Sequence, residues 1–205
     1  ADQEQAEAQL NLGIMYKYGR GVEENYTQAV YWFKKPAEKG YAEAQTNLGL
    51  MYEYGKGVKQ DYTEAILWYE KAAEQDDVTS QLSLALFYKF GKGVRKDYTQ
   101  VFYWYKKAAE LGDTGAQLNL GFMFQYGKGV EQDYEEAVTW YKKSSERGHP
   151  EAQSSLAWMY ENGKGIENDL KEAIYWYKKS AEQGNTKAQL KLGIIYKNGN
   201  GTVED

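Results

Sequence analysis

The sequence predicts an all-α fold, a solenoid of antiparallel helix hairpins with 36-residue repeats and about eleven helices. Three observations support this prediction. A short glycine-containing loop recurs at constant spacing, apolar residues on both sides of it follow helical periodicity, and capping residues precede the second run of each repeat. One hairpin buries too little apolar surface alone, so the repeats must stack to build a continuous core.

The recurring loop reads Gly-Lys-Gly-Val or a close variant. Its copies are 19–22, 55–58, 91–94, 127–130, 163–166 and, in degenerate form, 199–202. A phosphate-binding loop would need four residues between its glycines, then Lys and Ser or Thr, and a preceding strand. The regular recurrence instead predicts a structural joint inside each hairpin, with the lysines between the glycines exposed to solvent.

This period divides the chain into a single repeat array spanning residues 1–205. The predicted repeats are 5–40, 41–76, 77–112, 113–148 and 149–184, followed by a half repeat at 185–205 that holds a first helix and its loop. Neither end has a clearly polar capping helix, so we expect more chain beyond the array or a homo-oligomer formed through its exposed ends.

The first helix of each repeat has one apolar face, and a small residue flanks that face. In the first repeat the face consists of Ala8, Leu12, Met15 and Tyr16. Gly13 and its equivalents are always Gly or Ala, which lets a neighbouring helix approach closely. Gln9 and its equivalents are Gln in all six repeats.

The second helix of each repeat begins at a capping residue and carries its own apolar stripe. Asp133 stands at the predicted N-cap and Glu136 follows three residues later, as in a capping box. In the first repeat the stripe consists of Tyr26, Ala29, Val30, Phe33 and Ala37. A tryptophan recurs beside this stripe at 32, 68, 104, 140 and 176, and its strict period favours core packing over a sugar-stacking platform.

Two residues depart from the pattern where one repeat joins the next. Gly40, Gly112, Gly148 and Gly184 mark four of these joints, but the equivalent residue in the second repeat is Asp76. We therefore expect the 76–80 joint to be the least regular. Pro36 replaces Ala or Ser and removes a helical hydrogen bond, so it predicts a kink or an early end of its helix.

Composition excludes several functional classes. The net charge is −5 and the pI is about 5.2, which argues against a nucleic-acid partner. The chain has no cysteine, so disulfides, thiolate catalysis and cysteine-based zinc sites are excluded. No apolar run has the ~18 residues of a membrane span, so we expect a soluble chain with no membrane insertion. The opening ADQEQAEAQ is compatible with a mature chain or a fragment, which leaves cytoplasmic and periplasmic or secreted locations open.

The repeat unit resembles the Sel1-like repeat (SLR) family, a relative of the tetratricopeptide repeat. The second repeat carries the matching residues at Ala44, Gln45, Leu48, Gly49, Met51, Tyr52, Gly55, Gly57, Val58, Asp61, Tyr62, Ala65, Trp68, Tyr69, Lys71, Ala72, Ala73 and Glu74. The resemblance implies a right-handed α/α superhelix whose first helices line a concave groove. It also implies a scaffold or adaptor that binds other proteins; bacterial members often act in the envelope, in signalling or in contact with host cells.

Candidate binding residues are those at which the repeats differ. The Ile14 register lies nearly opposite the buried face of the first helix and comprises Ile14, Leu50, Leu86, Phe122, Trp158 and Ile194. The Tyr18 register follows one turn later and comprises Tyr18, Tyr54, Phe90, Tyr126, Asn162 and Asn198. By the tetratricopeptide analogy both line the groove. Asn47 and Asn119 could bind a peptide backbone beside them, and Trp158 is the strongest single candidate because Trp is enriched in binding hot spots.

A second interpretation of both registers is packing against the first helix of the next repeat. For the Ile14 register both interpretations stay open, whereas for the Tyr18 register packing is preferred. Polar residues beside the registers, such as Lys17 and Glu53, are of mixed charge, which suggests a partner of mixed charge.

The function predicted from these patterns is a non-enzymatic scaffold or adaptor that binds a protein or peptide in the groove. We predict no catalytic, cofactor-binding or metal-binding residue: His149 is expected to be an exposed turn residue, and serines such as Ser144 and Ser155 bring no paired base. One alternative is a hydrolase acting on cell-wall or β-lactam compounds, as proposed for some relatives. A purely structural spacer is the other.

Overall fold

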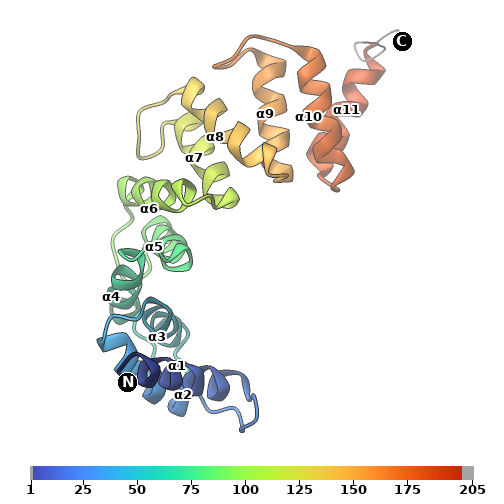
Figure 1. Cartoon of the computed structure of the whole chain (residues 1–205). Helices are drawn as coiled ribbons and strands as arrows, with labels where there is room; N and C mark the ends of the chain where they lie inside the picture. The colour runs from blue at the N-terminus through green and yellow to red at the C-terminus, as the bar shows by residue number, and fades with distance from the viewer. Residues whose placement is uncertain (1, 200–205) are drawn as a thin grey trace. The chain divides into compact units, whose positions relative to one another are not determined.

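The computed structural model describes residues 2–199. These residues form eleven α-helices and no strand (Figure 1). The helices are α1 (Asp2–Tyr18), α2 (Tyr26–Glu38), α3 (Ala42–Tyr54), α4 (Tyr62–Ala73), α5 (Val78–Phe90), α6 (Tyr98–Glu110), α7 (Thr114–Tyr126), α8 (Tyr134–Glu146), α9 (Pro150–Asn162), α10 (Leu170–Glu182) and α11 (Thr186–Lys197). The predicted all-α fold of 36-residue helix hairpins is confirmed. Of the last predicted loop, residues 200–202 lie outside the described part, as does the end of the half repeat at 185–205.

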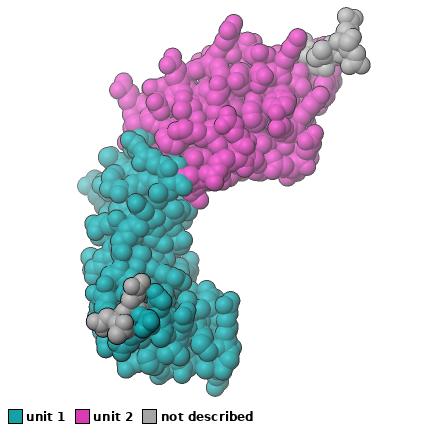
Figure 2. Space-filling model, viewed as in Figure 1, with its two compact units in different colours: residues 1–111 teal, residues 112–205 magenta. Residues whose placement is uncertain are grey.

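The helices fall into two compact units, coloured separately in Figure 2. Unit 1 is residues 1–111 and contains α1–α6, and unit 2 is residues 112–205 and contains α7–α11. Within each unit every helix packs against its neighbours in the chain, so that successive hairpins stack.

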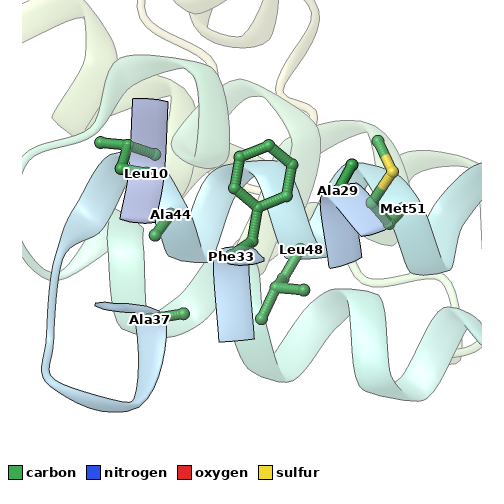
Figure 3. Packing of buried hydrophobic residues seen from close by; sticks show 7 residues of the cluster. All are labelled: Leu10, Ala29, Phe33, Ala37, Ala44, Leu48 and Met51. Carbon is green, nitrogen blue, oxygen red and sulfur yellow. The ribbon is translucent and has the colours of Figure 1, made fainter. Parts of the chain in front are cut away.

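The core of unit 1 joins the predicted stripe of α2 to the predicted face of α3, whereas in α1 Ala8 of the predicted face is exposed and Leu10, outside that face, is buried. Phe33 of α2 and Leu48 and Met51 of α3 are almost completely buried, and they lie together with Leu10 of α1 (Figure 3). The close approach expected at Gly13 is present, since a Cβ there would overlap the Phe33 ring. The smallest residue of the first helix therefore faces a buried aromatic ring of the second.

Unit 2 repeats this arrangement with tyrosine in place of phenylalanine. Tyr141 of α8 is fully buried with Leu156 and Met159 of α9, and a Cβ at Gly121 would overlap its ring. A further cluster around Tyr177 connects α9, α10 and α11. The predicted tryptophan packing is found at Trp140 and, in unit 1, at Trp104, which are both buried; Trp32, Trp68 and Trp176 are half-buried.

The predicted caps start the second helices. Asp133 accepts hydrogen bonds from the backbone N–H groups of Glu135 and Glu136 through Oδ1, at 2.9 and 3.0 Å. Asn25, Asp61, Asp97 and Asp169 cap their helices in the same way. In each case a side-chain oxygen satisfies backbone donors that have no partner inside the helix.

The two irregular joints differ in outcome: the effect of Pro36 is milder than predicted, whereas Asp76 is the one residue other than glycine with positive φ among residues 2–199. Pro36 lies inside α2, which continues to Glu38 and has the same 13 residues as α6, so the expected early end is wrong. Pro36 is in the last turn, where the helix loses only one internal bond. Asp76 adopts φ of 62°, the left-handed conformation that glycine has at the other joints, and α4 ends only one residue sooner.

The loop inside each hairpin also connects successive repeats. Gly55 ends α3 in the left-handed conformation, and a Cβ at Gly57 would overlap the backbone of Tyr26 in the preceding repeat. Lys56 is exposed, as predicted, but its Nζ lies 4.7 Å from the centre of the Tyr26 ring and 3.3 Å from its hydroxyl. The loops at 55–58, 91–94 and 163–166 therefore each rest on the first turn of the second helix of the preceding repeat.

The glutamine that recurs in every first helix has a structural role that the sequence pattern did not reveal. Gln45 Nε2 donates to the carbonyl of Ala37, and Gln81 Nε2 donates to the carbonyl of Ala73. In unit 2, Gln153 and Gln189 bond the equivalent carbonyls of Ser145 and Ala181. Each glutamine satisfies a helix-end carbonyl of the hairpin before it.

Candidate functional site

First helices of successive repeats contact one another through polar side chains. In unit 1, Lys17 Nζ of α1 donates to Asn47 Oδ1 of α3 at 2.8 Å, and Thr46 of α3 lies 2.9 Å from Ser80 Oγ of α5. In unit 2, Lys191 of α11 forms an ion pair with Glu161 of α9 at 3.0 Å. Each unit therefore presents a surface made of consecutive first helices, on which the candidate residues lie.

The Ile14 register divides between packing and exposure. Ile14 and Leu50 are half-buried against the core cluster of unit 1, and Phe122 and Trp158 are half-buried against that of unit 2. Leu86 and Ile194 are exposed. The half-buried members pack at one edge and keep part of the side chain at the surface, so they combine both predicted roles.

The Tyr18 register is an exposed aromatic series. Tyr18, Tyr54 and Phe90 in unit 1 and Tyr126 in unit 2 are between 55% and 61% exposed. The preferred interpretation, packing against the next repeat, is wrong for these residues. Each of these residues is the last residue of its helix. Large exposed apolar side chains in series commonly mark an interaction surface.

The two predicted asparagines are engaged in bonds within the protein. Asn47 is only 8% exposed; its Oδ1 accepts from Lys17, and its Nδ2 donates to the carbonyl of Glu43 at 2.8 Å. Asn119 is half-buried and donates to the carbonyl of Gly115. To bind a peptide backbone, Asn47 would first have to give up these contacts.

Buried tyrosine hydroxyls form a row of hydrogen bonds beneath the surface of first helices. Tyr69 donates to Glu53 Oε2 at 2.8 Å, and Tyr177 donates to Glu161 Oε2 at 2.7 Å. Burial raises the pKa of both hydroxyls far above the ordinary value, and the adjacent carboxylate raises it further. Tyr141 donates to Gln125, and burial alone is the main cause of its raised pKa. These acceptors, of which Glu53 and Gln125 are buried, therefore hold tyrosine hydroxyls inside the protein.

A hollow of about 200 Å³ opens on the first helices of unit 2. Its lining residues are Phe122, Gln125, Tyr126, Ser154, Ser155, Trp158, Tyr177, Lys187 and Lys191. Three predicted residues, Phe122, Tyr126 and Trp158, meet there. The rings of Phe122 and Tyr126 are stacked, with centroids 6.3 Å apart and planes 20° apart. The edge of Phe122 rests on Tyr141, which fixes the wall of the hollow.

Two lysines of this hollow were missed by the sequence-based search. Lys187 and Lys191 lie one turn apart on α11. At the position of Lys187, the earlier repeats have Glu7, Glu43, Thr79, Gly115 and Glu151. At the position of Lys191 they have Asn11, Asn47, Ser83, Asn119 and Ser155. This change of charge between repeats is visible in the sequence, since Lys191 falls in the same register as the predicted Asn47 and Asn119.

One protein-family model matches each repeat of the chain in turn. The model of the Sel1 repeat matches six times, at residues 6–41, 42–77, 78–113, 114–149, 150–185 and 186–205. The chain belongs to the Sel1 repeat family. Sel1 repeat proteins are typically protein-interaction scaffolds. A search of curated protein sequences found no match to the chain.

Solved Sel1 repeat structures resemble the chain along its length. A protective antigen of uropathogenic Escherichia coli strains that displays an SLR fold is 41% identical, with a TM-score of 0.92 over 100% of this chain. The present chain spans only 44% of the length of that antigen. A Sel1 repeat protein of Oxalobacter formigenes is also 41% identical, with a TM-score of 0.79 over 98% of this chain and 80% of the other.

The serine and histidine side chains considered for catalysis have structural roles in these Sel1 repeats. Ser144 is buried and donates to the carbonyl of Thr114, while Ser155 donates to the carbonyl of Glu151. His149 precedes α9 as its N-cap residue and is half-buried, so the expectation that it is an exposed turn residue is wrong in degree. Across residues 2–199, no three His, Asp or Glu side chains form a metal-binding group, and no helix could cross a membrane.

Proposed function

We propose that this Sel1 repeat chain is a non-enzymatic scaffold that binds a peptide or protein segment along its first helices. The observation that supports the proposal best is the exposed aromatic series at Tyr18, Tyr54, Phe90 and Tyr126. Packing within the protein does not explain these residues, since each leaves more than half of its surface in water. Aromatic side chains supply large contact areas and are frequent in binding interfaces.

The enzyme and spacer alternatives have less support. A hydrolase would need a nucleophile with an adjacent base, whereas Ser144 and Ser155 donate to backbone carbonyls. A spacer would have no need for a repeated exposed aromatic side chain on its first helices, because such residues favour association and lower solubility.

The proposal is tested by selecting peptides from a displayed random library against the purified chain. Binding of the selected peptides is then measured for a variant in which Tyr18, Tyr54 and Phe90 are all replaced by Ser. We expect binding to fall by tenfold or more, because hot-spot residues typically contribute about 2 kcal/mol each. These residues lie at the surface, so helix content and unfolding midpoint should change little.

A matched control replaces exposed aromatic residues of the second helices. Tyr31 and Tyr103 are also exposed, at 65% and 46%, but they lie on α2 and α6. Replacing both by Ser should leave peptide binding within about twofold, because isolated surface residues outside an interface contribute little. Equal losses in the two variants would contradict the assignment of the first helices as the binding surface.

A further inference from the structure

The hollow of unit 2 differs from the rest of the array in charge as well as in shape. We propose that it is a subsite for an acidic peptide segment, which places one large apolar side chain against Trp158 and a neighbouring Asp or Glu side chain beside Lys187. This inference deepens the proposed scaffold function and rests on it. It specifies which two side chains the bound segment needs where it meets this hollow.

The size and walls of the hollow fit a single side chain. Its volume of about 200 Å³ lies below the roughly 300 Å³ at which pockets for small organic ligands begin. Phe122, Tyr126 and Trp158 provide apolar lining, and Gln125 and Ser155 provide polar side chains beside them. Phe122 and Trp158 are half-buried against the core, so the walls are already ordered before a ligand arrives and binding costs little side-chain entropy.

The charge at the rim selects an acidic neighbour. Glu161 neutralises Lys191 through the ion pair at 3.0 Å, which leaves the charge of Lys187 uncompensated by that carboxylate. Lys187 lies in the first turn of α11, where a positive charge is unfavourable for the helix. Both charged residues that line the hollow are therefore basic, and one of them is not neutralised by Glu161, although the whole chain has a net charge of −5.

Three positions change together at the hollow. Trp158 is the only Trp in the Ile14 register, and Lys187 and Lys191 are the only lysines in theirs. The ion pair with Glu161 of α9 accounts for Lys191 as a contact between helices, whereas it does not account for Lys187. The combination of an aromatic wall and a basic rim matches a segment with an apolar residue next to an acidic one.

The inference is tested with short synthetic peptides that have acetylated and amidated ends, so that no terminal charge contributes. One position is Leu, Phe, Trp or Ala, and the next is Glu, Gln or Lys; the remaining residues are Gly and Ser. Binding to the full chain is followed by NMR, through the indole N–H of Trp158 and the backbone amides of α11. We expect the strongest binding for an aromatic residue followed by Glu, and at least threefold weaker binding when Glu becomes Lys.

Two variants separate the contributions of charge and wall. Lys187→Glu introduces the residue found at this position in three other repeats, and we expect it to reverse the preference from Glu to Lys peptides. Lys171→Glu is the matched control, because Lys171 is also an exposed lysine in the first turn of a unit 2 helix but does not line the hollow. Trp158→Ala should weaken every peptide by about tenfold.

The outcomes distinguish this inference from the scaffold proposal. Peptides that bind at Trp158 with equal strength for Glu, Gln and Lys would overturn the acidic subsite and leave the scaffold intact. The inference also fails if no peptide shifts the Trp158 signal, or if the charge preference survives in Lys187→Glu. The scaffold proposal is judged separately, by the library selection and the aromatic variants of unit 1.

Discussion

At the scale of single residues, Asp76 and Asp77 are neighbours with opposite effects on stability. Asp76 adopts the left-handed conformation with φ of 62°, which is unfavourable for a residue with a Cβ. Asp77 Oδ1 accepts from the Ser80 backbone N–H, which caps α5, and also from the Thr46 hydroxyl of α3. The first residue is strained where glycine would fit, and the second makes two bonds that no apolar residue can replace.

We therefore expect Asp76→Gly to raise the free energy of unfolding by about 0.5–1 kcal/mol. Asp77→Ala should lower it by about 1–2 kcal/mol, because a cap and a bond between repeats are both lost. Urea denaturation followed by circular dichroism measures both changes. Destabilisation by Asp76→Gly would show that its side chain, and not the backbone conformation, determines the stability of this joint.

The buried tyrosine hydroxyls predict that stability falls in alkaline solution. Below pH ~10, Tyr69, Tyr141 and Tyr177 keep their protons in both states, and their contribution is fully present. Above pH ~10 the unfolded chain releases these protons, while burial keeps the folded pKa higher. The free energy of unfolding should therefore decrease as pH rises through 10 and beyond.

Urea midpoints at about pH 8 and about pH 10.5 test this expectation. Tyr69→Phe should lower stability by about 1–2 kcal/mol at the lower pH, because Glu53 loses a buried partner. It should also make the alkaline decrease smaller, since one titrating group is removed. The first repeat already has Phe33 at this position, which indicates that the ring itself is tolerated. An unchanged alkaline decrease in Tyr69→Phe would contradict the assignment.

At the scale of the helices and loops, two glycines with similar backbone angles should respond differently to alanine. Gly57 has φ of 73° and lies against the Tyr26 backbone, whereas Gly184 has φ of 87° and would have open space around a Cβ. Gly184→Ala should cost only the backbone strain, about 1–2 kcal/mol. Gly57→Ala should cost about 3 kcal/mol or more, because the loop must also move away from the preceding repeat. Equal losses in urea denaturation would mean that the loop contact adds nothing.

Much of each element could be predicted from the sequence because local chemistry determines it. Asp133 starts α8 by capping its first N–H groups, and Gly127 ends α7 because only glycine takes the left-handed conformation freely. The effect of Pro36 could not be predicted, since it depends on how many helical bonds remain after the proline. The contact of Lys56 with Tyr26 could not be predicted either, because it joins residues of two different repeats.

At the scale of the whole molecule, we expect residues 1–111 to fold when produced alone. This unit contains its own buried cluster around Phe33, Leu48 and Met51, and its repeats are stabilised mainly by their nearest neighbours. The fragment should show the circular dichroism of packed helices and a cooperative urea transition. A shorter fragment ending at residue 94 lacks α6, exposes Leu84 and Phe87 of α5, and should unfold at lower urea. An unfolded 1–111 fragment would contradict this expectation.

The candidate site was predictable only in its apolar part. Phe122, Tyr126 and Trp158 could be predicted because they lie in apolar registers at which the repeats differ in residue type. The exposure of Tyr54 could not be predicted, since it depends on where α3 ends relative to the next hairpin. Asn47 has the polarity expected of a peptide-binding residue, but its side-chain oxygen already accepts a hydrogen bond from Lys17. Periodicity thus identifies which residues share a surface, whereas their free bonding capacity follows from contacts between repeats.

The recurring glutamine has a consequence for how such a chain can grow. Gln45 bonds Ala37, and Gln81, Gln153 and Gln189 do the same in their repeats, so the end of a hairpin is completed by a residue that belongs to the next one. In-frame duplication of any 36-residue segment supplies both a new hairpin and the glutamine that completes its predecessor. An insertion between Ala37 and Gln45 would separate donor from acceptor. Duplication can therefore lengthen this surface by whole repeats. Each new repeat can then acquire a different residue at the positions of Trp158 and Lys187.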